Sequence, residues 1–231
     1  MCLNDYLYIF ISLSLILLAS VAYSQETRKG IFSVSVGPSV PLSDFASDDL
    51  NADGAGGSGV GLNIGVQYVY PLSQNGLGIF AGIDFNYNGL SKDVKDEFEE
   101  IFKGIGFTSL DIKFSKYINI PITTGLVYSF QADEKIGVFA NAGLAFNLLR
   151  ITDLVVKSDL PTISSETDLA FSVGFKIGGG ILINKKYSVS INYLGLGKHN
   201  VEGIAKGDGI YDEFSGEQKV DLLNLKFGVA F

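Results

Sequence analysis

The chain has 231 residues, and its 17 Lys and Arg against 25 Asp and Glu give a formal net charge of −8 with no basic run. This length suits one β-domain of ordinary size, and the charged residues make up only 18 % of it, whereas about 25 % is usual in water-soluble domains. An acidic chain without a basic cluster lacks the electrostatic footprint of a nucleic-acid-binding protein, so we expect no nucleic-acid partner.

Residues 1–24 are predicted to be a signal peptide. Leu7–Val21 is an apolar run broken only by serines, and it is shorter than the roughly 20 residues that a membrane-spanning helix needs. Ala22 and Ser24 put small side chains at the positions that a signal peptidase reads, so we expect cleavage after Ser24 and a mature domain of residues 25–231. The segment departs from the usual pattern because it contains Asp5 and neither Lys nor Arg before the apolar run, which leaves a misplaced start codon or a membrane anchor as the alternative.

From residue 32 onward, apolar and small polar residues alternate with the period of a β-strand in eight successive segments. In the second segment, for example, Leu62, Ile64 and Val66 share one face, whereas Asn63 and Gly65 share the other. Named by the first and last residues of their apolar faces, the segments are Phe32–Leu42, Val60–Tyr70, Leu77–Tyr87, Ile118–Phe130, Ile136–Leu148, Leu169–Ile183, Tyr187–Tyr193 and Leu223–Phe231.

The composition of the two faces decides which one meets lipid. The apolar faces carry no charge, as contact with hydrocarbon requires, and the opposite faces are mostly Gly, Ser, Asn and Ala. A soluble ligand-carrying barrel, the alternative, would have an exterior rich in Lys, Glu and Thr, whereas small polar residues suit the crowded interior of a narrow barrel. The sequence therefore predicts an all-β fold, an eight-stranded antiparallel up-and-down transmembrane β-barrel surrounded by outer-membrane lipids and lipopolysaccharide.

The connections between the segments alternate in length. Short turns are expected around Ser73–Gly76, Gln131–Lys135 and Asn184–Lys186, and long connections at Asp44–Gly59, Leu90–Ser115, Arg150–Thr167 and Gly195–Gln218. Outer-membrane barrels have short turns in the periplasm and long loops outside the cell, so both chain termini are expected in the periplasm.

One long connection contains a predicted helix, Ser91–Phe102. Val94, Phe98 and Phe102 recur at helical spacing, acidic residues cover the other side, and Ser91 is a suitable cap. Such a helix could lie over the barrel mouth or at the outer-leaflet surface, or it could be a docking element for a partner, and the sequence does not separate these alternatives.

Eight strands leave an interior just wide enough for side chains to fill, so we expect a closed lumen and not an open pore. Phe80, Val127 and Phe139 lie on the inward register of adjacent strands at one expected level, and they are predicted to form an apolar plug. Asp84, Lys176 and Lys226 face the same lumen. Because an isolated charge in a dry interior is costly, these three are expected to be paired or hydrated together.

Three stretches resemble the small outer-membrane β-barrel proteins of Bacteroidota, grouped with the OmpX/OmpA-type barrels and the PorT-like "porin family" proteins. They are FSVSVGPSVPLSDF at Phe32–Phe45, the Tyr-x-x-Ile-Pro pattern at Tyr117–Pro121, and the alternating final strand Leu222–Phe231. The resemblance implies the barrel fold and, for the terminal Phe231, a role as the signal read by the barrel-assembly machinery. Pro121 departs from ideal strand chemistry because it lacks an N–H, so a bulge is expected there.

Residues suited to catalysis or metal binding are few. His199 is the only His, follows the seventh segment without a partner at a telling spacing, and is expected to be an exposed loop residue. Asp49, Asn51 and Asp53 match the first half of a calcium loop, but the position of the bidentate Glu is Val60, so a flexible acidic loop is the favoured interpretation. We expect no catalytic residue and no cofactor.

Two classes of function remain open at the level of sequence. The favoured one is a non-enzymatic surface barrel, which is structural or presents its extracellular loops to an extracellular or envelope protein. The alternative is an outer-leaflet lipid-modifying enzyme that uses His199. The PorT-like resemblance also allows an accessory role in secretion or envelope assembly.

Overall fold

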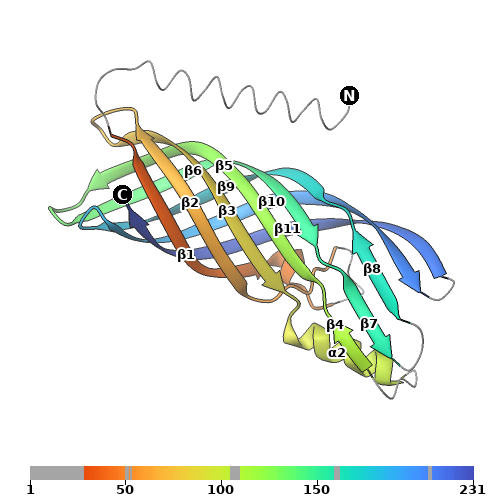
Figure 1. The fold of residues 1–231 in the computed structure, drawn as a ribbon. Coiled ribbons are helices and arrows are strands. Elements are labelled where there is room, and N and C mark those ends of the chain that lie inside the picture. Colours follow the sequence, from red (N-terminus) through yellow and green to blue (C-terminus); the bar gives the residue numbers. More distant parts are fainter. Residues whose placement is uncertain (1–28, 50–51, 53, 105–109, 159–161, 208–209) are drawn as a thin grey trace, which may run out of the picture.

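The computed structural model describes residues 29–231 except 50–51, 53, 105–109, 159–161 and 208–209. Its strands form one antiparallel sheet that closes on itself as a barrel (Figure 1). The predicted signal peptide, residues 1–24, lies outside the described residues.

Eight strands form the closed ring, in the order β1-β2-β3-β5-β6-β9-β10-β11, and β11 pairs back onto β1. Their bounds are Ile31–Leu42 (β1), Gly61–Pro71 (β2), Leu77–Gly89 (β3), Lys116–Gln131 (β5), Ile136–Ile151 (β6), Ala170–Ile183 (β9), Tyr187–Gly207 (β10) and Ile210–Ala230 (β11). Each strand neighbours the next in the ring, which confirms the up-and-down eight-stranded barrel predicted from the alternation.

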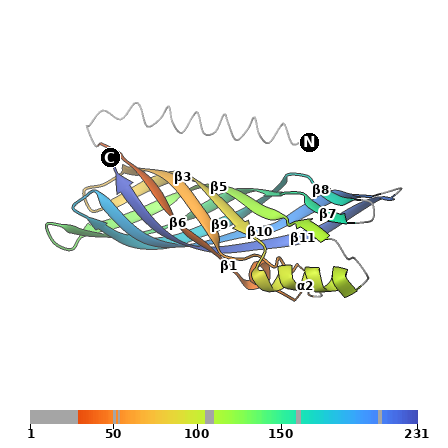
Figure 2. The same ribbon diagram turned by 60° about the horizontal axis from the view of Figure 1, so that its bottom comes forward.

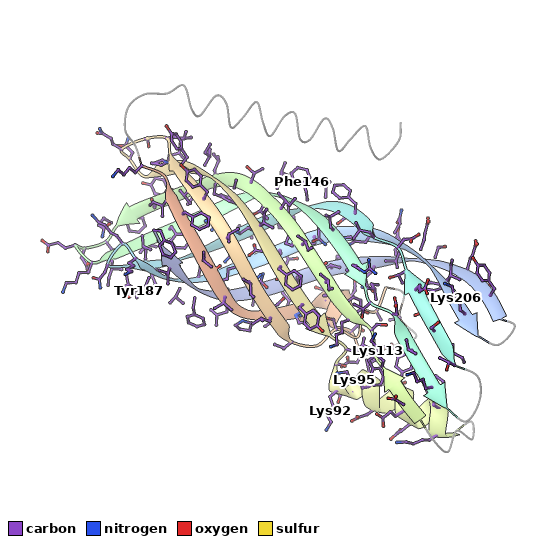
Figure 3. The ribbon with its side chains drawn as sticks, viewed as in Figure 1. Lys92, Lys95, Lys113, Phe146, Tyr187 and Lys206 are labelled. Carbon is purple, nitrogen blue, oxygen red and sulfur yellow. The ribbon has the colours of Figure 1, made fainter. Side chains whose placement is uncertain are left out.

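The outside of the ring is the apolar face of every strand. Val36, Leu126, Phe175 and Phe227 are each 48–56 % exposed, although they are large apolar side chains. Figure 3 shows Phe146 directed away from the barrel wall, and Tyr187 lies on the outside near the end that holds the short turns. A soluble protein would bury such a surface, so this band is the part of the barrel that contacts hydrocarbon.

The start of β1 and the end of β11 lie together at the end of the barrel that holds the short turns, which in outer-membrane barrels is the periplasmic end. The Phe231 amide donates to the Phe32 carbonyl (2.8 Å), and the two rings lie 6.5 Å apart. The Phe231 side chain is 76 % exposed and so stands at the membrane edge beside β1. Figure 1 shows the C-terminus at this end and the longer structures at the opposite one.

Beyond the membrane, the expected long loops are largely folded. The segment Gly195–Gln218 is not a loop, because β10 and β11 continue as a hairpin to Gly207 and Ile210. β8 (Ile163–Thr167) pairs with this hairpin, and β7 (Leu154–Ser158) and β4 (Leu110–Lys113) extend the sheet. The extension was hidden in the sequence because no hydrocarbon faces it, so neither face needs to be apolar. The sheet β11-β10-β8-β7-β4 beyond the membrane is called the extracellular sheet below.

The predicted helix is present as α2 (Lys92–Gly104). Ser91 caps it, since its Oγ accepts a hydrogen bond from the Val94 amide (3.2 Å), and Val94 is fully buried. Figures 1 and 2 show α2 beyond the barrel wall alongside β4, where Phe98 packs edge-on against Phe114 at 6.4 Å. None of the helices in the described part of the chain is long and apolar enough to cross a bilayer.

The expectation of a bulge at Pro121 is wrong. β3 and β5 keep one register on both sides of it, from Ile83 opposite Ile122 to Asn86 opposite Asn119. The strand tolerates the missing N–H without an extra residue. The register shift lies instead between Gly195 and Lys198, where Gly197 has φ +81°, a conformation that favours glycine.

Candidate functional site

The candidate site is the lumen, and its periplasmic part holds the three residues of the predicted plug. Phe80 and Val127 are buried, with 1 % and 5 % of their surface exposed. Phe139 is half-buried and lies opposite Ser129 in the strand register, closer to the short turns than the other two residues. It lines a hollow of about 530 Å³ at the end of the barrel that holds the short turns. The apolar layer therefore consists of Phe80 and Val127, and Phe139 borders the opening below it.

Charged side chains cross the lumen next to this layer. Lys226 on β11 forms an ion pair with Asp84 on β3, and both are buried. Gly65 leaves the room for this pair, because a Cβ there would overlap the Asp84 carboxylate. Lys176 on β9 donates to Gln67 Oε1 on β2 (3.1 Å), and its ammonium lies 5.1 Å from the centre of the Phe80 ring.

Inside the lumen, the next layer toward the extracellular sheet consists of asparagines. The sequence patterns did not identify these asparagines as a network. Asn86 Oδ1 accepts hydrogen bonds from Asn63 Nδ2 (2.9 Å) and from Asn224 Nδ2 (2.8 Å), across strands β2, β3 and β11. Asn63 Nδ2 also reaches Asp84 Oδ1 at 3.4 Å, so the amides join the ion pair. The alternation had placed these residues on the inward face, but contacts across a lumen have no counterpart in local sequence.

His199 is fully buried, so the expectation of an exposed loop residue is wrong. It points into the barrel from the continued β10, and its partners come from other strands. Nδ1 lies 3.2 Å from the Gln218 carbonyl oxygen, and Nε2 lies 2.9 Å from Asn147 Nδ2 and 2.7 Å from Ser172 Oγ. Because a carbonyl only accepts, Nδ1 carries the proton and Nε2 accepts from Asn147.

A cluster of buried apolar residues, called the apolar cap below, lies at the end of the lumen opposite the short turns. Its centre is Phe45, in the 3-10 turn η1 (Ser43–Ala46) after β1, which is fully buried and packs edge-on against Tyr117 at 5.0 Å. The Tyr117 hydroxyl donates to the Gly56 carbonyl (2.6 Å), which fixes the returning chain over the mouth. Barrel residues complete the cap: Ala145, Leu149, Ala170, Leu194, Leu196, Val201, Val220 and Leu222.

This cap was missed because Phe45 follows β1 without strand periodicity, and because its apolar neighbours lie on faces expected to be polar. Tyr117 is buried in β5, where its ring packs against Phe45.

The structure describes the calcium-loop candidate only in part. Asp49 is described, but Asn51 and Asp53 lie outside the described residues. Among the described residues, no group of three His, Cys, Asp or Glu side chains could hold a metal ion.

A closed ring of strands, an apolar outer band and a polar interior joined by hydrogen bonds and an ion pair define an integral outer-membrane β-barrel protein. The chain belongs to the outer membrane protein beta-barrel domain family, whose model matches residues 10–231. No curated protein matches the sequence at a significant level.

Several solved structures are similar in fold. The outer membrane protein OprG from Pseudomonas aeruginosa is 12 % identical, with a TM-score of 0.50 over 88 % of this chain and 97 % of that one. Neisserial surface protein A is 12 % identical, with a TM-score of 0.44 over 87 % and 95 %. Ail, the attachment invasion locus protein of Yersinia pestis, is 14 % identical, with a TM-score of 0.40 over 88 % and 100 %. The likeness to OprG concerns the fold alone.

Proposed function

We propose that this outer-membrane barrel is non-enzymatic, that its lumen is closed, and that it presents its extracellular sheet to a protein partner. The observation that carries the closed lumen is the apolar cap around Phe45. A fully buried ring at this end of the lumen, packed against Tyr117 of the barrel wall, supports a lumen without an aqueous path, and the Tyr117 hydroxyl holds the connecting chain there through Gly56.

The middle of the lumen supports the same conclusion. The Lys226–Asp84 pair joins β11 to β3 and the Lys176–Gln67 hydrogen bond joins β9 to β2, so side chains from strands that are not neighbours in the ring meet inside the lumen. An ion passing through would have to break a buried ion pair and displace Phe80. Both steps are costly in a low-dielectric interior.

The extracellular sheet supports the presenting role. Its hairpin carries Tyr211 and Phe214, which are 66 % and 40 % exposed although they lie outside the lipid band. Exposed aromatic side chains on a rigid sheet suit a protein interface, where aromatic residues are enriched. The ion pair of Lys206 with Glu166, at 2.6 Å, holds the hairpin to β8, and Lys206 lies on this extension in Figure 3.

The lipid-modifying enzyme is the second candidate, and the 2.7 Å contact between His199 and Ser172 is the observation in its favour. The rest of the geometry opposes it. The Ser172 hydroxyl has one proton, and the Leu196 carbonyl competes with the imidazole Nε2 for it. The Gln218 backbone carbonyl, and not a carboxylate, is the partner of His199 Nδ1 among the described residues, and both His199 and Ser172 are buried inside the barrel.

The resemblance to Bacteroidota barrels, including PorT-like ones, remains a prediction about source and role. In this proposal, a part in secretion or envelope assembly is one form that presentation to a partner could take. Contacts of the apolar band with outer-membrane lipids and lipopolysaccharide, and recognition of Phe231 by the barrel-assembly machinery, belong to the same proposal.

Planar-bilayer recording of the purified, folded protein tests the closed lumen. We expect no stable single-channel steps. Large, stable steps from the wild-type protein would mean a continuous aqueous path and would overturn the proposal. The matched control is the Phe85→Ala variant, which removes a ring of the same size from the lipid-facing side and should also remain silent.

A further inference from the structure

The hollow at the end of the barrel that holds the short turns has apolar walls, unlike most of the lumen. Inward positions along the strands are mostly Gly, Ser and Asn, but Ile31 of β1, Phe139 of β6 and Leu182 of β9 are apolar and line this hollow of about 530 Å³. Ile31 is 42 % exposed, although its register position faces away from the lipid band. Apolar surface left uncovered in a concave site outside the lipid band is typical of a place where a ligand binds.

The polar part of the lining is neutral except for one lysine. Gln74, Asn75, Ser129 and Gln131 are uncharged, and Lys185 alone carries a charge among the described residues that line the hollow. The lining therefore favours a ligand with one anionic group over a cationic one.

The turn that carries Lys185 is fixed in position. Asn184 and Lys185 have φ values of +53° and +57°, so the sequence places a lysine in a tight hairpin turn where glycine is favoured. The Asn184 amide donates to the Lys135 carbonyl (2.6 Å), which ties this turn to the β5–β6 hairpin. On that hairpin, Asp133 Oδ1 accepts from the amides of Lys135 and Ile136 (2.7 Å each) and so caps its own turn. The Lys185 side chain is exposed and has no ion pair among the described residues.

The walls and the single ammonium together define the chemical class of the ligand. Apolar walls suit an apolar body, and the volume lies within the roughly 300–1,000 Å³ of small-molecule sites. A phosphate group would bring a charge of about −1.5 to −2, and placing it against Phe139 and Leu182 would cost desolvation that one lysine does not offset. A carboxylate brings one charge and forms a charge-assisted hydrogen bond with one ammonium.

We propose that this hollow binds a small monocarboxylate with an apolar body. The body packs against Ile31, Phe139 and Leu182, and the carboxylate pairs with Lys185. The hollow is reached from the side of the short turns, whereas the extracellular sheet lies at the opposite end of the barrel. This site is therefore separate from the partner surface proposed above.

Ligand-observed fluorine NMR on the folded barrel in lipid nanodiscs tests the proposal. The probe is para-fluorinated phenylpropanoate, and the fluorinated phenylpropanamide and phenylpropylammonium are its neutral and cationic counterparts of similar shape. Nanodiscs without protein correct for partition into lipid. We expect saturable binding of the carboxylate at one site per barrel, about two- to fivefold tighter than the amide, as one partly exposed ion pair provides. The ammonium should bind more weakly than the amide.

Two lysine variants test the rim. Lys185→Met should lower the affinity for the carboxylate to that for the amide and leave the amide unchanged. Lys186→Met is the matched control, because it removes the same charge from the next residue, whose ammonium lies 5.7 Å from the centre of the Tyr187 ring and not in the lining of the hollow. It should change neither affinity.

Two further variants test the walls. Phe139→Ala and Leu182→Ser should weaken carboxylate and amide alike, and heat-modifiable mobility on gels shows which of them has folded. The absence of saturable binding above protein-free nanodiscs would overturn the proposal. So would equal affinity of the wild-type protein for carboxylate and amide, an equal loss in Lys185→Met and Lys186→Met, or full affinity in the folded wall variants. Channel steps in planar bilayers would refute the proposed closed lumen and leave these affinities unchanged, so the two failures are distinguishable.

Discussion

Replacing Asp84 by alanine would leave Lys226 without its carboxylate in the middle of the lumen. Asp84 and Lys226 are 2 % and 7 % exposed, and Lys176 adds a second buried ammonium to the same lumen. Removing one partner of a buried pair costs about 3–5 kcal/mol, because the other charge stays desolvated. We therefore expect the free energy of unfolding of Asp84→Ala to fall by about this amount without the appearance of conductance, since the cap and Phe80 remain.

Urea unfolding of the protein folded in detergent micelles, followed by heat-modifiable mobility on gels, measures this loss. The Asp84→Ala/Lys226→Met double variant is the control, because it removes both charges and replaces the Lys stem with an apolar one. We expect the double variant to be more stable than Asp84→Ala. The reasoning would be refuted if the free energy of unfolding of Asp84→Ala stayed within about 0.5 kcal/mol of wild type, the range of surface substitutions. It would also be refuted if the double variant lost as much free energy of unfolding as Asp84→Ala and Lys226→Met together, each measured alone.

Three further predictions follow from the cap, the buried histidine and the C-terminus. Phe45→Ala should lower the free energy of unfolding by about 3–5 kcal/mol, and by more than the lipid-facing control Phe85→Ala, as the same urea assay would show. His199→Ala should lower thermal stability and leave lipid A composition unchanged by mass spectrometry; altered acylation would instead favour the enzyme. Deleting Phe231 should reduce membrane insertion in fractionated cells, and wild-type insertion with normal heat-modifiability would contradict its role as the assembly signal.

The buried histidine shows where local sequence stops being informative. His199 was placed on an exposed loop because strand alternation ends near Tyr193. The chain continues as a strand through the bulge at Gly197, which restores the inward direction for residue 199. The partners Asn147 and Ser172 are 52 and 27 positions away, so no spacing within the sequence could indicate them.

The residues of the predicted lumen plug show the same limit of local sequence. The inward direction of Phe80, Val127 and Phe139 follows from period-2 alternation, but their heights depend on the register between strands. That register places Val127 opposite Gly78 and Phe139 opposite Ser129. Phe139 therefore lies at the end of the barrel that holds the short turns. The apolar cap around Phe45 depends on a short turn whose residues carry no periodic pattern.

The sequence by itself determined the lipid-facing surface, the number and direction of the barrel strands, and the helix capped by Ser91, because each depends on residues within one or two turns or pleats of each other. Only the tertiary structure decided what fills the barrel. The Lys226–Asp84 pair joins residues 142 positions apart, and it forms because ring closure brings β11 within reach of β3 across a narrow lumen. The alternation specifies that a side chain points inward, but the side chain that it meets there is set by register and closure, which are properties of the whole ring.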